Sequence, residues 1–550
     1  MKLMKNIIIV LMIGAMLAGL ASCGPRTILF GKGSPADEKL FFAMQGNGNV
    51  EAAKEAIEAG ANIDRFGGSL GDTTDHNRRE KNPFRLACFA GKTHIAKVLL
   101  EEGADPNIID VYGWPIMAYV VQMRDTDLCM LMLEKGADIN KEGEKGKTPL
   151  NACFIQSVNC SGGDKRDIDT EKMYDFLVQN GAEVTPDTLT HAIVGVYGDG
   201  YTHYSLVRKI AAQLEQAGQS VNIDPLLKSI ILVDESAAKQ ILRTGKKFDK
   251  RCLFFAAAFS TPEIFEALLR EGRDLTERDL INESIFEVAA KCGNIGMLEY
   301  LIPKFDIHGK AGYDALKAAV MNNQVEAVRM LIDNNVLVVS PVQKDLYIDY
   351  EVLFPYACAN GNTEMAYMLI ENGITVIEDE YPAAIIYGEY STAINSASRY
   401  DQIPIIELLI EMGSNVNKNE AGYDPLNIAA FYGNIEAVKL LVENGANING
   451  NVYIPLGEAC RGRNLEIAEF LIQQGADVNI SWSGGTGGLP LYYAVMGGEF
   501  ELVKLLVENG ATIPDELVSW ADPESEYGIG MSDRIYQYLL SERQKADNAR

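Results

Sequence analysis

Two stretches of the sequence contain residues that could hold a phosphate group. Gly146-Lys147-Thr148 and Gly91-Lys92-Thr93 both match the end of a phosphate-binding loop, whose backbone N–H groups and lysine cradle a nucleotide. That loop also needs a glycine five residues earlier, where the sequence has Lys141 and Leu86. The glycines between 483 and 488 do not complete a dinucleotide fingerprint, because Pro490 stands at its third glycine. We therefore predict no nucleotide site and no small-molecule substrate.

The sequence is equally poor in residues arranged for metal binding or nucleophilic catalysis. None of its histidines pairs with another His or with Cys at the spacing of a metal finger. No G-x-S-x-G elbow and no H-E-x-x-H helix occurs. Carboxylates are abundant, so the sequence leaves an acid–base pair open, although most of them belong to a solvated face. We therefore predict no catalytic residue, no metal ligand and no cofactor.

The first 22 residues predict export. Lys2 and Lys5 precede an apolar run from Ile7 to Ala21 that ends in small residues, which is typical of a signal peptide. A membrane-spanning helix needs about 20 apolar residues, more than this run provides. The end of the segment, Leu-Ala-Ser-Cys23, resembles the lipobox of bacterial lipoproteins. The resemblance implies that Cys23 becomes the first residue of the mature chain and carries a lipid; an ordinary secreted protein is the alternative.

The residue after the lipobox bears on location. Gly24, and not Asp, follows Cys23. In a Gram-negative host, the resemblance to lipoproteins with this residue implies that the protein is sorted to the outer membrane. We therefore expect the bacterial cell envelope, with the chain lipid-anchored and, in a Gram-negative host, facing the periplasm.

The chain is strongly acidic. Its formal net charge is −27, and the part after residue 22 carries −29, because the first 22 residues contain two lysines and no acidic side chain. An acidic field repels phosphate backbones and attracts basic surfaces. We predict no nucleic-acid partner and favour a protein partner with a basic surface; the alternative is that the charge only keeps the chain soluble.

Three of the nine cysteines are predicted to be packing residues rather than partners in a disulfide. They fall at one repeated position that needs a small buried residue, held elsewhere by Ala430. Packed helices are about 8–10 Å apart, beyond the reach of a disulfide. These three are Cys88, Cys358 and Cys460. The sequence leaves open one local disulfide among Cys129, Cys153 and Cys160.

The clearest repeated unit runs from 421 to 449, and its first half predicts a short helix. Asp424 can cap the helix with its side chain, and Pro425 suits the first turn, which has no use for an N–H. Ala429 and Ala430 keep one face small so that a neighbour can approach. Gly433 then allows the chain to turn.

The second half of the unit predicts a second helix and its end. Apolar residues recur there at helical spacing and form a buried stripe, namely Ile435, Val438, Leu441 and Val442. Gly445 suits the left-handed residue that ends a helix, and the next residues lead into a hairpin. One helix pair cannot bury its own faces, so like neighbours must stack on it.

This unit resembles the ankyrin repeat, whose signature combines a G-x-T-P-L-H-x-A-A core with a leucine-rich helix and G-A-D-x-N. The resemblance implies an all-α solenoid of about fourteen helix-turn-helix repeats with short β-hairpin loops, over about residues 37–513. The helix-ending positions that support it are Gly60, Gly103, Gly136, Gly181, Gly218, Gly245, Gly272, Lys304, Asn335, Gly373, Gly413, Gly445, Gly475 and Gly510.

The resemblance is weakest from about 185 to 345. After Gly218 and Gly245 the spacing contracts to 27 residues, so we expect short turns in place of hairpins. Lys304 stands where a glycine should end a helix, and 311–314 is expected to begin a hairpin because it repeats the residues of 421–424. Insertions at 65–81 and about 157–169 are expected to be loops.

These features predict a chain with six parts. They are a lipoprotein signal peptide at 1–22, a lipidated Cys and tether at 23–36, ankyrin repeats at 37–184, degenerate repeats at 185–345, further ankyrin repeats at 346–520, and a capping helix with a tail at 521–550.

Partners of ankyrin proteins usually rest on the hairpin tips and on the exposed residues of each first helix, so the resemblance implies a protein partner there. The matching tip residues are Tyr112, Trp114 and Tyr423. The matching helix residues are Phe89, Met321, Phe431, Tyr432, Arg461 and Met496. Aromatic and Arg side chains are frequent interface anchors; the alternative is that Phe431 and its equivalents pack against a neighbouring repeat.

Together these observations predict a membrane-tethered repeat protein that binds a protein partner as scaffold, protector or inhibitor. The alternative is an envelope enzyme with a carboxylate-based site in the concave face of the solenoid.

Overall fold

The protein is described by a computed structural model that covers most of the chain after residue 33. The described residues are 34–45, 48–64, 82–110, 112–154, 170–198, 204–245, 247–270, 274–279, 282–336, 353–372, 384–386, 389–391, 393–418, 423–481, 488–523 and 531–549. The signal peptide, Cys23 and both predicted insertions lie outside them.

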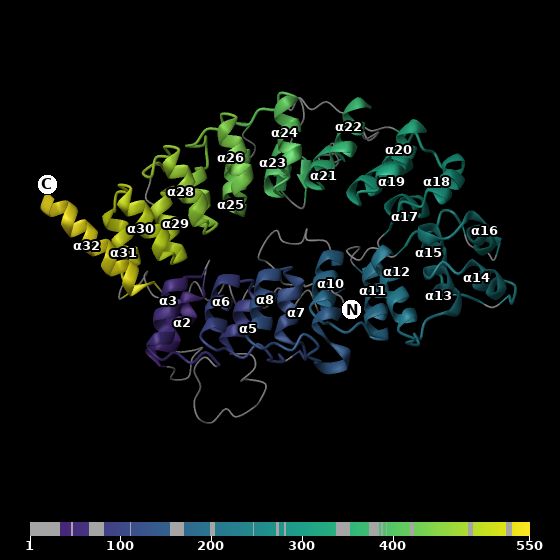
Figure 1. The fold of residues 1–550 in the computed structure, drawn as a ribbon, viewed down its shortest axis with the longest axis horizontal. Helices are drawn as coiled ribbons and strands as arrows, with labels where there is room; N and C mark the ends of the chain where they lie inside the picture. Colours follow the sequence, from purple (N-terminus) through teal and green to yellow (C-terminus); the bar gives the residue numbers. More distant parts are fainter. Residues whose placement is uncertain are drawn as a thin grey trace, which may run out of the picture.

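The chain is an all-α solenoid in which helices follow one another in contacting pairs (Figure 1). The first helices of the pairs are α2 (Pro35–Ala43), α5 (Pro83–Phe89), α7 (Ile116–Gln122), α9 (Pro149–Ala152), α11 (Pro186–Gly198), α13 (Pro225–Ile231), α15 (Cys252–Phe259), α17 (Ile285–Lys291), α19 (Lys310–Met321), α21 (Leu353–Ala359), α23 (Ala393–Arg399), α25 (Pro425–Tyr432), α27 (Pro455–Arg461) and α29 (Pro490–Gly497).

Each first helix is followed by its second helix. The second helices are α3 (Val50–Glu58), α6 (Thr93–Glu101), α8 (Thr126–Glu134), α10 (Thr170–Gln179), α12 (Tyr204–Gln216), α14 (Glu235–Leu242), α16 (Pro262–Arg270), α18 (Ile295–Leu301), α20 (Val325–Asp333), α22 (Thr363–Glu371), α24 (Ile403–Glu411), α26 (Ile435–Glu443), α28 (Leu465–Gln473) and α30 (Phe500–Glu508). A final pair, α31 (Asp515–Ala521) and α32 (Asp533–Ala549), completes the array.

Other regular structure is confined to the connections. In the described part of the chain, two short 3-10 helices occur, η1 (Glu144–Gly146) and η3 (Ile302–Lys304). The strands β1 (Ala384–Ile386) and β2 (Glu389–Ser391) form an antiparallel hairpin in the register Ala384 to Ser391. Within the described residues, none of the helices is long enough and apolar enough to cross a lipid bilayer.

The clearest unit forms the two helices that its residues predict. The side chain of Asp424 accepts a hydrogen bond from the Asn427 N–H at 3.0 Å and so caps α25, with Pro425 in the first turn. Ala429 and Ala430 are fully buried, which lets the neighbouring pairs approach. Gly445 ends the second helix at φ +85°, a left-handed conformation that favours glycine.

Asparagine side chains bind several helix pairs to the pair before them. Asn464, at the start of α28, donates from Nδ2 to the carbonyl oxygens of Ala430 and Phe431 at 2.7 and 2.9 Å. Asn434 donates in the same way to Ser398 and Arg399 at 2.7 and 2.8 Å. Because these bonds satisfy carbonyls at the end of the preceding first helix, they fix the register of the stack.

A second row of asparagines joins the connections between repeats. Asn479, the last residue of a G-A-D-x-N motif, donates to the Gly510 carbonyl at 3.0 Å and accepts from the Thr512 N–H at 2.7 Å. Asn417 makes the equivalent bonds to Gly445 and Asn447 at 3.0 and 2.6 Å. The conformation of these helix-ending segments therefore depends on the repeat before them.

The structure corrects two expectations in the weak stretch. Lys304 does not end a helix in a left-handed conformation but closes η3, because a side chain with a Cβ disfavours that conformation and Pro303 supports the tighter turn. Residues 311–314 do not begin a hairpin, since they lie inside α19, which starts at Lys310. At Asn335 the left-handed conformation does occur, with φ +61°.

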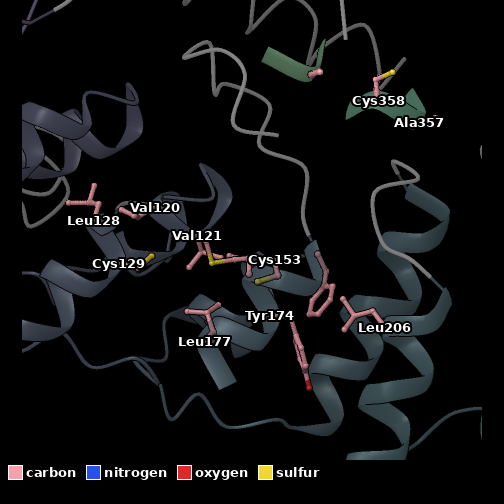
Figure 2. Packing of buried hydrophobic residues seen from close by; sticks show 14 of the residues in the cluster. Val120, Val121, Leu128, Cys129, Cys153, Tyr174, Leu177, Leu206, Ala357 and Cys358 are labelled. Carbon is pink, nitrogen blue, oxygen red and sulfur yellow. The ribbon is translucent and has the colours of Figure 1, made fainter. Parts of the chain in front are cut away.

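The cysteines in the described residues are free thiols, as the packing interpretation predicts. Cys88, Cys358 and Cys460 are buried, and burial raises the pKa of the Cys88 and Cys460 thiols. Cys129 and Cys153 are also free and lie among apolar side chains of α7, α8 and α10 (Figure 2). Cys160 lies outside the described residues.

The array doubles back on itself. Figure 1 shows the later helices returning above the earlier ones, so that α31 and α32 lie beside α2 and α3. Contacts between α3 and α32 confirm that the first and last pairs meet.

Replacing Asn464 with Asp tests the asparagine bonds. The change keeps the shape of the side chain but removes both donors and sets a carboxylate oxygen against two carbonyls, so we expect the free energy of unfolding to fall by about 1–3 kcal/mol. Urea unfolding followed by circular dichroism measures this loss. Asn444→Asp is the matched control, because that exposed amide bonds only to Leu440 of its own helix; equal losses in both variants would contradict the interpretation.

Candidate partner-binding surface

The residues predicted to bind a partner form clusters at the ends of the first helices. In the N-terminal part, Phe89 ends α5 and meets the ring of Tyr119 from α7 edge-on, with ring centroids 5.6 Å apart. The Arg85 guanidinium lies 5.5 Å from the Phe89 ring centroid. Phe89 is half-buried in this position, so part of its ring remains accessible.

The tip before α7 is held by one carboxylate. Asp110 accepts hydrogen bonds from the N–H groups of Tyr112 and Trp114 at 2.9 and 2.8 Å, and from the hydroxyl of Tyr119. The side chain of Lys147 lies 5.3 Å from the Trp114 ring centroid and donates to the Tyr112 carbonyl. Tyr112 is thereby presented to solvent, with 56% of its surface exposed, while Trp114 is half-buried.

In the C-terminal part, a ladder of side chains crosses successive first helices at one position. This position directly follows the small buried residue that Ala430 represents, and in α23 and α25 its carbonyl accepts the asparagine bond described above. It is occupied by Arg399 in α23, Phe431 in α25, Arg461 in α27 and Met496 in α29. We call these four residues the ladder.

The central members of the ladder are in direct contact. The Arg461 guanidinium lies 4.6 Å from the Phe431 ring centroid, and the rings of Phe431 and Tyr432 meet edge-on with centroids 5.1 Å apart. The Arg399 guanidinium lies 4.9 Å from the Tyr432 ring centroid. The two arginine contacts are attractions between a cation and an aromatic face, and the ring pair is an edge-to-face aromatic contact, so these groups hold one another in place.

The hairpin tip above the ladder adds two stacked tyrosines. Tyr423 and Tyr453 lie with their ring centroids 4.4 Å apart and an interplanar angle of 20°. Arg461 connects this stack to the ladder, because it hydrogen-bonds to Tyr423 and pairs with the Glu458 carboxylate at 3.1 Å. Burial raises the pKa of Tyr423, although Arg461 opposes the shift.

Four of the predicted residues are therefore brought together, namely Tyr423, Phe431, Tyr432 and Arg461. Phe89, Tyr112 and Trp114 lie in the N-terminal clusters, Met496 is half-buried in α29, and Met321 stands apart at the end of α19 with 37% exposure. The prediction missed Arg399, Tyr453 and Tyr119. The sequence could have indicated Arg399, because Arg399 stands as many residues before its second helix as Phe431 does.

Two buried carboxylates with raised pKa values lie beside this surface. Burial raises the pKa of Asp424 to about 6, and burial also raises the pKa of Glu458, which Arg461 partly offsets. Both have structural roles, one as a helix cap and the other as the partner of Arg461. Across the described ranges, no group of three or more His, Cys, Asp or Glu side chains is placed to hold a metal ion.

Comparison with known proteins identifies the repeats. A family model described as ankyrin repeats, in three copies, matches residues 40–143, 84–186, 253–341, 354–452 and 450–516, which together make up more than half of the chain. The chain belongs to the ankyrin repeat family. Its all-α solenoid is thereby confirmed, and ankyrin repeats are protein–protein interaction modules.

Two curated ankyrin proteins are similar to short parts of the chain. "Ankyrin repeat and MYND domain-containing protein 1" from Mus musculus is 33% identical over 66 residues, which is 12% of this chain and 7% of that protein. "Ankyrin repeat-containing protein P1E11.10" from Schizosaccharomyces pombe is 34% identical over 68 residues, which is 12% of this chain and 33% of that protein. The matches thus span a third or less of either relative.

The raised pKa of Asp424 predicts how stability in this ankyrin repeat depends on pH. Because the folded-state pKa of about 6 exceeds the unfolded value, the ionised carboxylate destabilises the fold above pH 6, and this penalty disappears as the pH falls through 6 towards 4. Asp424→Asn keeps the cap without the charge, so we expect it to raise the free energy of unfolding at pH 7 by about 1–2 kcal/mol.

Urea titrations of both proteins at pH 7 and pH 4 measure the effect, and the gain should vanish at the lower pH. Asp234→Asn serves as the control, because Asp234 caps α14 at an exposed site, where it accepts from the Ala237 N–H at 2.9 Å. A gain at pH 7 in the control, or a loss in Asp424→Asn, would contradict the role of burial.

Proposed function

We propose that this ankyrin repeat protein is a lipid-anchored scaffold of the bacterial envelope that holds a protein partner and protects or inhibits it. The observation that carries the binding role is the ladder with its stacked tyrosines. Phe431, Tyr423 and Arg461 hold one another in fixed, half-exposed positions, so little side-chain freedom is lost when a partner packs on them. Rigid aromatic and arginine groups of this kind are frequent binding anchors.

The charge of the chain supports a partner with a basic surface. A formal net charge of −27 creates a field that accelerates the approach of a cationic protein and repels nucleic acid. The arginines of the ladder do not oppose this, because Arg461 is paired with Glu458 and Arg399 lies over Tyr432. Binding would then combine long-range attraction with short-range packing on the aromatic groups.

The membrane anchor is inferred from the N-terminal sequence alone. A lysine-containing start, an apolar run and the Leu-Ala-Ser-Cys23 ending support lipidation at Cys23, and Gly24 supports the outer membrane in a Gram-negative host. A short tether from Cys23 to α2 would keep the solenoid close to the membrane, within reach of envelope proteins.

A pull-down from native membranes tests partner binding. We expect one specific partner to be captured by the wild type and lost when Phe431 and Trp114 are both replaced by Ala, with a dissociation constant raised about 30-fold or more. Met412→Ala is the control, because Met412 is an exposed apolar side chain at the end of a second helix. Thermal unfolding of all variants verifies their fold; undiminished capture by the double variant would refute this binding surface.

Metabolic labelling with an alkyne fatty acid tests the anchor separately. We expect the wild type to be labelled and to sediment with membranes, and Cys23→Ser to lose the label because serine offers no thiol for lipid attachment. A wild type that carries no label and does not sediment with membranes would exclude the lipoprotein assignment. That result would not bear on the proposed binding surface.

A further inference from the structure

The two ends of the array stack on each other as neighbouring repeats do. Asn49, at the start of α3, donates from Nδ2 to the carbonyl of Val495 at 3.4 Å. Val495 occupies in α29 the position that Ala430 occupies in α25, so this bond is the counterpart of the one from Asn464 to Ala430. The turn after α29 fits against the same residue, because a Cβ added to Gly498 would lie 2.1 Å from Asn49 Oδ1. The first repeat therefore uses the penultimate helix pair as its preceding neighbour.

An arginine in an unfavourable backbone conformation spans this junction. Arg463 has φ +63°, at a position where some repeats have glycine, such as Gly433 at +84°, and others a residue with a side chain, such as Arg124 at +60°. A residue with a Cβ is strained in this region. Its guanidinium donates to the Gly48 carbonyl of the first repeat at 2.6 Å, to Gly497 at 2.8 Å and to the Glu499 carboxylate at 2.5 Å. The strained position thus supplies a bond across 415 residues of sequence.

One carboxylate of the first repeat caps the last helix. Glu55 of α3 accepts from the Ser532 hydroxyl and from the N–H groups of Asp533 and Arg534, all at 2.7 Å. These donors begin α32, where a carboxylate is favoured by the unpaired N–H groups and the helix dipole. The pKa of Glu55 is lowered despite its partial burial, by its bond to Lys39 and by these donors.

Further charged groups surround Glu55. Lys39 of α2 pairs with Glu55 at 2.8 Å and with Asp533 at 2.5 Å, across 494 residues of sequence. Arg534 pairs with Glu51 at 2.8 Å and lies 3.6 Å from the centroid of the Phe500 ring. The side chains of Asp533 and Arg534 are 61% and 52% exposed, so salt can screen these pairs.

We propose that the array exchanges between a closed and an open form, and that Glu55 and Arg463 are the latch that holds it closed. Inside the array, neighbouring repeats are joined by continuous buried apolar faces as well as by asparagine bonds. At the junction, charged and polar groups carry most of the directional contacts, and the asparagine bond is longer, 3.4 Å against 2.7 Å. Salt screens such charged contacts and so weakens the junction, whereas it does not weaken apolar stacking.

The latch adjoins the candidate partner-binding surface. Arg461 of the ladder and Arg463 of the latch lie two residues apart in the same turn, which packs so closely that a Cβ added to Gly462 would meet the Phe431 carbonyl at 2.2 Å. A partner that shifts Arg461 would therefore move the latch. This link rests on the proposed function, but the latch itself does not.

Zero-length carbodiimide crosslinking of the purified protein without a partner tests the latch. Lys39 and Asp533 form an ion pair across the junction, so mass spectrometry should find their peptides joined in the wild-type monomer. In the variant carrying both Glu55→Gln and Arg463→Gly, the yield should fall about tenfold, as expected from the loss of charge-assisted hydrogen bonds. The radius of gyration from small-angle X-ray scattering should rise in parallel, and 1 M salt should have the same effects on the wild type.

Arg463→Gly separates a latch from a merely structural residue. Glycine relieves the backbone strain at this position, so the thermal midpoint of the variant should not fall even though the array opens. Glu263→Gln is the control, because it removes an exposed ion pair to Lys239 between α14 and α16, far from the junction in sequence.

The outcomes decide the proposal. The proposal is supported if the crosslink yield falls in the double variant and in high salt. The yield in the control variant must stay unchanged, and light scattering must show that the protein is monomeric. A wild type that never forms the crosslink, or one that stays closed in high salt and in the double variant, overturns the proposal. Partner capture is measured independently, so failure of the latch and failure of the binding surface are distinguishable.

Discussion

Stacking between neighbouring helix pairs is the constraint on which the whole molecule depends. Each pair has apolar faces that it cannot cover alone, and residues such as Ala429 and Ala430 are buried only because another pair lies against them. The asparagine bonds add direction to this packing. Asn464 satisfies two carbonyls of the preceding helix, so one pair cannot slide or rotate on the next without leaving buried acceptors unpaired.

The stacking of helix pairs also positions the side chains of the candidate partner-binding surface. The backbone of Phe431 accepts the bond from Asn464, and its side chain therefore projects at a fixed height beside that of Arg461. The same position in the first helix recurs from α23 to α29, which makes a ladder from residues about 30 apart in sequence. Within the ladder, Phe431 and Arg461 are held together by the attraction between a guanidinium group and an aromatic face.

The ends of a solenoid are normally its exposed stacking faces, and a capping element must cover them. In this chain the first repeat lies against α29 and α32, so each end covers the other. The sequence anticipated a capping helix over the last repeat, but not that Glu55 of the first repeat would in turn cap that helix. At this junction Arg463, in a left-handed conformation, carries a bond to the Gly48 carbonyl of the first repeat.

The sequence by itself determined the repeat, its helix boundaries and the packing role of the buried cysteines. Gly60, Gly445 and Gly510 end helices where they were predicted to, because a left-handed residue and a helical stripe are properties of a few consecutive residues. Where local signals were weak, prediction failed, as at Lys304 and in the first turn of α19. At Lys304 the Cβ disfavours the left-handed conformation and Pro303 favours the tighter turn of η3.

Only the tertiary structure decided which side chains meet across repeats. That Phe431 lies under Arg461, and that Lys39 reaches Asp533, cannot be derived from any single unit. The position of the last repeat relative to the first is the sum of small rotations at every junction. No local pattern encodes that sum, so the meeting of the two ends is a property of the complete array.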